Sequence, residues 1–200
     1  MIDLRRIRQS SDWRFVGIFL GIAVLLQIIG PEYFRYQRDW LQSGQVWRVI
    51  TAHWVHVGWA HLVLNTVGLA ICVTLTTPNW SLRRWFAQSL AMGAAISILC
   101  TLQNPEISWY AGFSGVLFGL YFLAAHDLYR RDRLIAVLVA SAIVVKIVLE
   151  QYTSIDLDSS ALIGARVVVD AHLYGLLSAI AIALLWSTYT MNHETRTHSN

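Results

Sequence analysis

The chain has 200 residues, of which 56% are hydrophobic and only 14% are charged, with a formal net charge of +3. Soluble domains usually carry about 25% charged residues, so this composition excludes an ordinary soluble domain. Several uncharged stretches approach the roughly 20 residues that a helix needs to cross the hydrocarbon core of a bilayer. We therefore expect one all-α membrane domain over residues 1–200, with six transmembrane helices near residues 15–31, 61–76, 85–102, 114–126, 134–150 and 168–189.

The distribution of basic residues predicts how these helices are oriented. Ten arginines lie at the N-terminus, in the second and fourth connections and in the tail, whereas only Arg35, Arg38, Arg48 and Arg166 lie in the odd-numbered connections. Basic residues favour the cytoplasmic side of a membrane, so we expect both termini in the cytoplasm. The same bias accounts for the positive net charge, and we therefore expect no binding to nucleic acid.

The longest connection, residues 31–60, is unusually aromatic. Tyrosine and tryptophan favour the membrane interface, where the ring is buried and its polar end stays hydrated. One interpretation is an interfacial belt that anchors the protein. A second, compatible one is a folded element lying partly in the outer leaflet, in which the Trp47-Arg48 pair holds a network of hydrogen bonds. The aromatic residues are Tyr33, Phe34, Tyr36, Trp40, Trp47, Trp54 and Trp59.

The second helix begins with His61-x-x-x-Asn65. Residues four apart lie on one face of a helix, and two polar side chains on one face of a membrane helix indicate a polar partner or water. A single histidine there could equally be a packed side chain with satisfied nitrogens. His53, His56 and His61 are spaced closely enough to suggest zinc, but no acidic residue lies between Asp39 and Glu106. Catalytic zinc sites usually include a carboxylate, so we expect no metal and no cofactor.

Ser114 lies in the run Gly112-Phe113-Ser114-Gly115. Its local sequence alone favours a helix N-cap. Gly112, Gly115 and Gly119 also leave room for the close approach of another backbone. A helix from Ser114 to His126 would rise only about 20 Å, less than the core thickness. The serine would then lie below the membrane surface, where a helix N-terminus can stabilise a developing oxyanion.

His172 opens the last apolar stretch, and Gly175 and Ala179 follow with four-residue spacing. Such a face of small residues allows tight packing against another helix, so the helix carrying His172 can approach the glycine-lined helix carrying Ser114. Phe118, one turn after Ser114, would then support the imidazole. His172 taken alone could be a packed core histidine, but a serine and a histidine brought together form a nucleophile and a general base.

These features together resemble those of a known family. From the first helix to the sixth, the chain is similar to the rhomboid intramembrane serine proteases. The matching motifs are Trp47-Arg48, His61-x-x-x-Asn65, Gly112-x-Ser114-Gly115 and Ala171-His172-x-x-Gly175.

The resemblance implies a six-helix rhomboid-like bundle and a catalytic dyad with no third acidic member. Ser114 would be the nucleophile and His172 the base, while His61, Asn65 and the Ser114 backbone N–H would stabilise the oxyanion. Asp170 precedes His172 by two residues and points away from it on a helix, so we expect no Asp–His pair. The supporting residues would be Gly112, Gly115, Phe118 and Gly175.

The resemblance also implies a substrate and a location. The substrate would be a single-pass membrane protein, cut near the outer end of its transmembrane segment. The enzyme would lie in the bacterial inner (cytoplasmic) membrane, with its active site open to the periplasm.

Two residues depart from the common family pattern. Phe118 stands where many members have tyrosine, and Phe113 where many have a small residue. The small size and the run Tyr110–Leu117 resemble the rhombosortase branch most, which implies substrates with a Gly-Gly-containing C-terminal sorting tail.

Two other classes of function remain open. A catalytically silent rhomboid-like factor would bind membrane proteins, but such proteins usually lack the serine or the histidine. A small transporter or channel would use a buried polar residue such as Lys146. However, Glu150 lies one turn further toward the outer face, so an interfacial ion pair explains Lys146 more simply. Many transporters also show an internal repeat, and none is visible in this sequence.

Overall fold

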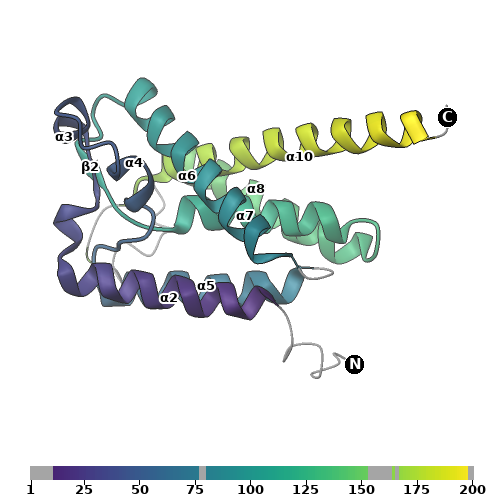
Figure 1. Ribbon diagram of the computed structural model, residues 1–200, viewed down its shortest axis with the longest axis horizontal. Coiled ribbons are helices and arrows are strands. Elements are labelled where there is room, and N and C mark those ends of the chain that lie inside the picture. Colours follow the sequence, from purple (N-terminus) through teal and green to yellow (C-terminus); the bar gives the residue numbers. More distant parts are fainter. Residues whose placement is uncertain (1–10, 77–79, 153–163, 165–166, 198–200) are drawn as a thin grey trace.

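The computed structural model describes residues 11–76, 80–152, 164 and 167–197, and these are almost entirely helical (Figure 1). Four helices, α2, α6, α8 and α10, are long and apolar enough to cross a membrane, whereas α5 and α7 are apolar but shorter. These helices indicate a multi-pass membrane protein. Their bounds are Ser11–Ile29 for α2, Trp59–Leu75 for α5, Leu82–Gln103 for α6, Ser114–Leu128 for α7, Arg133–Tyr152 for α8 and Val169–Thr197 for α10.

The connection between α2 and α5 folds into short elements at the end of the bundle opposite the C-terminal end of α10 (Figure 1). Its strand β1 pairs antiparallel with β2, which lies between α6 and α7, and Tyr36 is opposite Tyr110. This pairing joins the first connection to the segment that precedes Ser114. The elements are η1 (Pro31–Tyr33), β1 (Tyr36–Gln37), α3 (Arg38–Gln42), α4 (Arg48–Thr51) and β2 (Trp109–Tyr110).

Arg48 holds this connection together. Its guanidinium donates to the carbonyl oxygens of Glu32 and Arg35, at 2.9 and 2.6 Å, and to the Gln45 side-chain oxygen at 2.8 Å. Only 1% of its surface is exposed. Trp47 lies outside this network and donates from its indole to the Tyr33 carbonyl at 3.4 Å. The predicted network of the Trp47-Arg48 pair thus depends mainly on the arginine.

The aromatic residues of the connection do not form one interfacial belt. Trp47 and Trp59 are half exposed, whereas Tyr36 and Trp54 are buried. The Trp54 ring packs against rings from α2 and from the segment before α7, which ties the connection to the bundle. The side chain of Trp40 lies outside the described part of the chain. Residues Arg5, Arg6, Arg8 and Arg166, on which the predicted orientation partly depends, also lie outside it.

Polar contacts at the other end of the bundle join α2, α6 and α7. The Trp85 indole donates to Asp12 at 2.6 Å, near the start of α2. Asp127, near the end of α7, accepts from the Trp80 indole at 2.8 Å and pairs with Arg84 at 2.7 Å. The helices are therefore fixed at both ends, and the glycine-lined α7 lies between α5, α8 and α10.

Candidate active site

The structure brings Ser114 and His172 into direct contact. The Ser114 Oγ lies 2.9 Å from Nε2 of His172, across the interface between α7 and α10. Ser114 is the first residue of α7, and its hydroxyl contacts the imidazole instead of capping the helix. The 15 residues of α7 rise about 22 Å. This is less than the ~30 Å hydrocarbon core, so α7 alone is too short to cross it.

Glycines make this contact between the helices possible. A Cβ at Gly115 would lie 2.5 Å from the carbonyl oxygen of Ala171, the residue before His172. A Cβ at Gly119 would lie 2.8 Å from the carbonyl oxygen of Gly175. The face of small residues on α10 thus packs closely against α7, as the sequence predicts, and this packing sets the separation of the serine and the histidine.

The Phe118 ring supports the imidazole, as the sequence analysis predicts. It lies one turn after Ser114, and its centroid is 4.6 Å from that of His172. This contact needs the ring and not a hydroxyl group, so phenylalanine is sufficient here.

Gly112 shapes the chain before the serine. Its φ is +138°, a conformation that side chains rarely adopt. A Cβ there would also lie 2.5 Å from Cε1 of His61. The His61 imidazole therefore lies directly against the backbone two residues before Ser114, which places it beside the candidate nucleophile.

His61 and Asn65 are both buried on α5. Within the described residues, His61 Nδ1 and Asn65 Nδ2 have no hydrogen-bond partner. Buried polar atoms of this kind are costly unless something binds them. Both groups can donate to an oxygen, as an oxyanion site requires. His61 lines the cavity described next, and Asn65 is not among its described lining residues.

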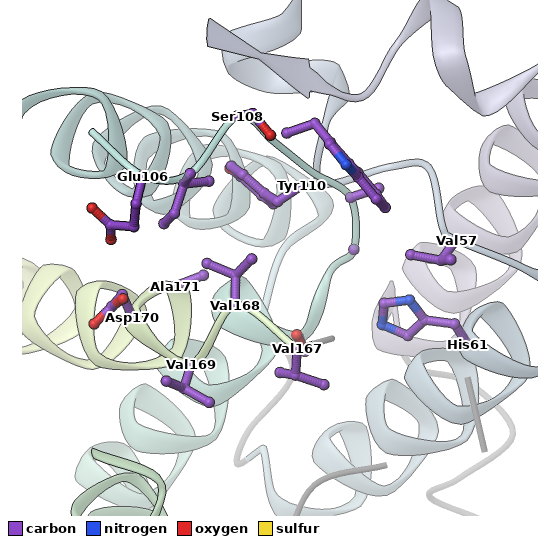
Figure 2. A pocket seen from close by; sticks show the side chains of 15 residues that line it. Val57, His61, Glu106, Ser108, Tyr110, Val167, Val168, Val169, Asp170 and Ala171 are labelled. Atoms are coloured by element: carbon purple, nitrogen blue, oxygen red, sulfur yellow. The ribbon is translucent and has the colours of Figure 1, made fainter. Parts of the chain in front are cut away.

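A cavity of about 240 Å³ opens beside Ser114. Figure 2 shows His61 and Val57 on one side of it, the segment from Glu106 to Tyr110 on another, and Val167–Ala171 on a third. Extended backbone before α7 and the start of α10 thus form its walls. The cavity is large enough for part of a peptide and for water, and the serine lies at its wall.

The structure adds to the site one residue that the sequence places only in an ion pair with Lys146. Oε2 of Glu150 lies 2.8 Å from Nδ1 of His172, on the side of the ring opposite Ser114. Oε1 of the same carboxylate pairs with Lys146. The ion pair predicted on this helix therefore forms, and the Glu150 side chain is buried within the protein, with only 2% of it exposed. The absence of an acidic partner, implied by the family resemblance, does not describe this structure.

A signal for Glu150 is nonetheless present in the sequence. The buried residues of α8 include Ile143 and Ile147, and Glu150 continues their spacing of four and three residues, which marks one face of a helix. A carboxylate on the inward face of an apolar helix is typical of a functional site. Lys146, four residues before Glu150, favours the simpler interpretation that the two side chains form an ion pair at the surface.

The remaining candidate residues lie elsewhere. Asp170 accepts from the Asn104 amide at 3.1 Å and points away from His172, as expected. His53 is buried and shares Nε2 with the Tyr110 hydroxyl at 2.7 Å and the Ser97 hydroxyl at 3.1 Å. Burial lowers the pKa of His53 to about 4. In the described part of the chain, no three His, Cys, Asp or Glu side chains come together as metal ligands would.

A family model described as "Rhomboid domain" matches residues 43–189. The chain belongs to the rhomboid family. It is 27% identical over 120 residues to "Rhomboid protease GluP" of Bacillus subtilis (strain 168). The aligned residues cover 56% of this chain and 23% of that protein. It is 31% identical over 77 residues to "Rhomboid-like protease 5" of Toxoplasma gondii, covering 38% of this chain and 9% of that protein.

The rhomboid match includes every candidate site residue. Residues 43–189 contain Ser114 and His172 as well as His61 and Asn65. This rhomboid chain spans less than a quarter of the length of either relative. Rhomboid proteins are generally intramembrane serine proteases, although rhomboid-like members can be inactive. The family and the multi-pass membrane architecture are therefore established. Whether this member is a protease depends on the residues of its candidate active site.

Proposed function

We propose that this rhomboid protein is an intramembrane serine endopeptidase that uses Ser114 as nucleophile and His172 as general base. The observation that carries the proposal is the 2.9 Å contact between Ser114 Oγ and His172 Nε2. A serine hydroxyl is a weak nucleophile until an adjacent base accepts its proton. An inactive member of the family has no need to keep a serine and a histidine aligned in this way.

The proposed reaction begins with acylation. Ser114 Oγ attacks the carbonyl carbon of a peptide bond as its proton passes to Nε2 of His172. The carbonyl π-electrons move to oxygen and form a tetrahedral oxyanion. When the C–N bond breaks, the imidazolium returns the proton to the leaving nitrogen, so an amine departs and an acyl-enzyme remains. Water then attacks the ester through the same base, releasing the acid and restoring the serine.

The oxyanion would be stabilised by groups that lack partners in the resting site. The backbone N–H of Ser114 is at the start of α7, where the helix leaves its first N–H groups free. His61 Nδ1 and Asn65 Nδ2 are buried and unpaired within the described residues. One such donor is typically worth ~2.7–4 kcal/mol in the transition state.

The proposed substrate is a single-pass membrane protein cut near the outer end of its transmembrane segment. The cavity beside Ser114 accepts extended backbone more readily than a helix, because Gly112 and the segment from Glu106 to Tyr110 form one of its walls. The arginine distribution supports cytoplasmic termini and a site open to the periplasm of a bacterial inner membrane.

The resemblance to the rhombosortase branch supports a narrower substrate. We expect proteins with a Gly-Gly-containing C-terminal sorting tail, whose small residues fit an extended backbone beside Phe113. Cells that lack this protein should then accumulate such substrates with the tail attached, which mass spectrometry of their C-termini would detect. Unchanged C-termini would show that the protease cleaves a different substrate.

The decisive experiment is covalent labelling of the detergent-solubilised protein with a fluorophosphonate, which reacts with activated serines. We expect labelling of the wild type and none of Ser114→Ala or His172→Ala, with all three proteins retaining the same thermal unfolding transition. Equal labelling of Ser114→Ala would refute the assigned nucleophile. A folded wild type that does not label or cleave would favour a rhomboid-like binding factor.

A further inference from the structure

We propose that Glu150 is a positioning residue that completes a Ser114–His172–Glu150 triad, so that this protein does not work with a serine–histidine dyad alone. The inference rests on the proposed function, because it assigns Glu150 to the same reaction. It depends on three independent observations: the hydrogen-bond geometry of the imidazole, the unequal exposure of Lys146 and Glu150, and the packing that holds α8 in place.

The two nitrogens of His172 have different partners. Nε2 is 2.9 Å from the Ser114 hydroxyl, and Nδ1 is 2.8 Å from Oε2 of Glu150. An ionised carboxylate only accepts hydrogen bonds, and a neutral imidazole carries one N–H. The proton of the neutral ring therefore lies on Nδ1, and Nε2 is left to accept from Ser114. Glu150 thus selects the tautomer that a general base requires.

The exposure of the Lys146–Glu150 pair argues against a purely structural surface pair. The Lys146 side chain is 37% exposed, whereas the Glu150 side chain is 2% exposed. A lysine that only reaches for the interface needs no buried partner. Burying a carboxylate in a membrane helix is costly, so such groups generally face the protein interior and serve a function. Here Lys146 compensates the charge from outside, and Oε2 remains for His172.

Apolar contacts on either side fix the position of the carboxylate. Ile143 and Ile147 of α8 form a buried cluster with Leu176 of α10, and Phe118 of α7 packs against it. Ile147 is three residues before Glu150, and Leu176 is four residues after His172. The carboxylate–imidazole contact is therefore bordered by packed side chains about one helical turn away on each helix.

In the reaction, the carboxylate would stabilise the charge that appears on His172. When Nε2 takes the serine proton, the imidazole becomes positive and both ring nitrogens carry a proton. Glu150 stays ionised and accepts from Nδ1 throughout, so no proton is transferred to it. The positive charge disappears when Nε2 protonates the leaving nitrogen. Glu150 therefore acts only through His172 and never touches the substrate.

A charge-dependent role has a signature in the pH profile of serine labelling. The charged or titratable groups near His172 are Glu150 and Lys146 on α8, His61 on α5 and Asp170 on its own helix. Removing the negative charge disfavours the imidazolium, so Glu150→Gln should move the acid limb of the profile to lower pH. Removing the positive charge of Lys146 has the opposite effect, because it favours the imidazolium. Lys146→Met should therefore move the acid limb to higher pH.

The experiment measures fluorophosphonate labelling rates of the full-length protein from pH 5 to 9. We expect Glu150→Gln to lower the plateau rate by about 10²- to 10⁴-fold and to shift the acid limb as stated. Asp127→Asn is the matched control, because it removes another hydrogen-bonded carboxylate far from the site. It should change neither rate nor profile. A Glu150→Gln protein with the wild-type rate and profile overturns the inference.

Failure of the inference and failure of the proposed function give different results. If Ser114→Ala still labels, the proposed function fails. If only the Glu150→Gln prediction fails, a dyad remains. Should Glu150→Gln not fold, ¹⁵N spectra of histidine-labelled wild type, assigned with His172→Gln, decide the matter. A protonated Nδ1 and an unprotonated Nε2 at neutral pH support the inference, and the opposite tautomer overturns it.

Discussion

Gly175 of α10 and the carbonyl oxygen of Gly115 of α7 are in direct backbone contact, since a Cβ at position 175 would lie only 1.9 Å from that oxygen. Gly115 directly follows Ser114, and Gly175 lies three residues, about one helical turn, after His172. No flexible side chain is available to move aside, so the whole of α10 would have to shift to accept one added methyl group.

We predict that Gly175→Ala lowers stability and abolishes serine labelling. Overpacking against backbone should cost about 3 kcal/mol or more, which corresponds to roughly 6–12 °C in the unfolding midpoint of a chain of this size. Gly21→Ala on α2 is the control, because nothing lies within 4 Å of its Cβ. It should be neutral or slightly stabilising. Thermal unfolding in detergent measures both, and equal midpoints for the two variants would contradict the prediction.

The second prediction concerns the oxyanion. Asn65→Ala should lower kcat by about 10²- to 10³-fold while leaving KM nearly unchanged, because the lost donor acts on charge that develops in the transition state. Cleavage of a reporter membrane protein in proteoliposomes measures both constants. Gln88→Leu is the control, since Gln88 is a buried amide on α6 whose oxygen lacks a partner in the described chain. An Asn65→Ala enzyme with wild-type kcat would remove Asn65 from the site.

The third prediction is a loss of stability in acid, caused by His53. Burial lowers its pKa to about 4 in the folded protein, against 6.5 for an unhindered imidazole. Between these values the unfolded chain binds more protons than the folded one, so the stability present above pH 6.5 is lost as the pH falls through about 4. The difference in pKa corresponds to on the order of 3 kcal/mol.

Unfolding midpoints measured from pH 7 to pH 4 test this prediction. His53→Gln should be less stable at pH 7, because it disturbs the contacts with Tyr110 and Ser97, but its midpoint should fall less steeply with pH. His126→Gln changes a more exposed imidazole, 44% accessible, and should keep the wild-type slope. An unchanged slope in His53→Gln would show that other groups control acid sensitivity.

The fourth prediction concerns Arg48. Arg48→Lys should destabilise the protein by about 2 kcal/mol, because an ammonium group cannot reproduce the planar set of donors that holds two carbonyl groups and a side-chain amide. Arg83→Lys replaces an exposed arginine and should be neutral. Thermal unfolding compares the two. Equal midpoints would mean that the network contributes nothing to stability.

Much of the site could be predicted because its signals are local. Gly112 and Gly115 around Ser114 marked a close backbone approach, and His61 and Asn65 share a face of one helix. The contact of Glu150 with His172 joins residues 22 positions apart on two helices. The spacing of Ile143, Ile147 and Glu150 indicates that Glu150 shares their inward face, but the side chain that it meets on another helix depends on how α8 packs.

The first connection was predictable only in part. Its aromatic residues indicated the membrane interface, and half-exposed Trp47 and Trp59 agree with that. Tyr36 and Trp54 instead enter the core. An interfacial tryptophan and a buried one have the same local sequence signature. Tyr36 is buried where β1 pairs with β2, and Trp54 is buried where its ring meets rings of α2, so both depend on contacts between distant segments.

The packing of α8 has a consequence for how the sequences of related proteins can drift. Only 17% of its spanning window is buried, so most of its surface accepts any apolar side chain that suits lipid. Contacts inside the protein constrain only a narrow stripe of side chains on α8, namely Ala136, Ile143, Ile147 and Glu150. Comparison of whole segments would score this helix as variable, although one position on it determines the state of the histidine beside the serine.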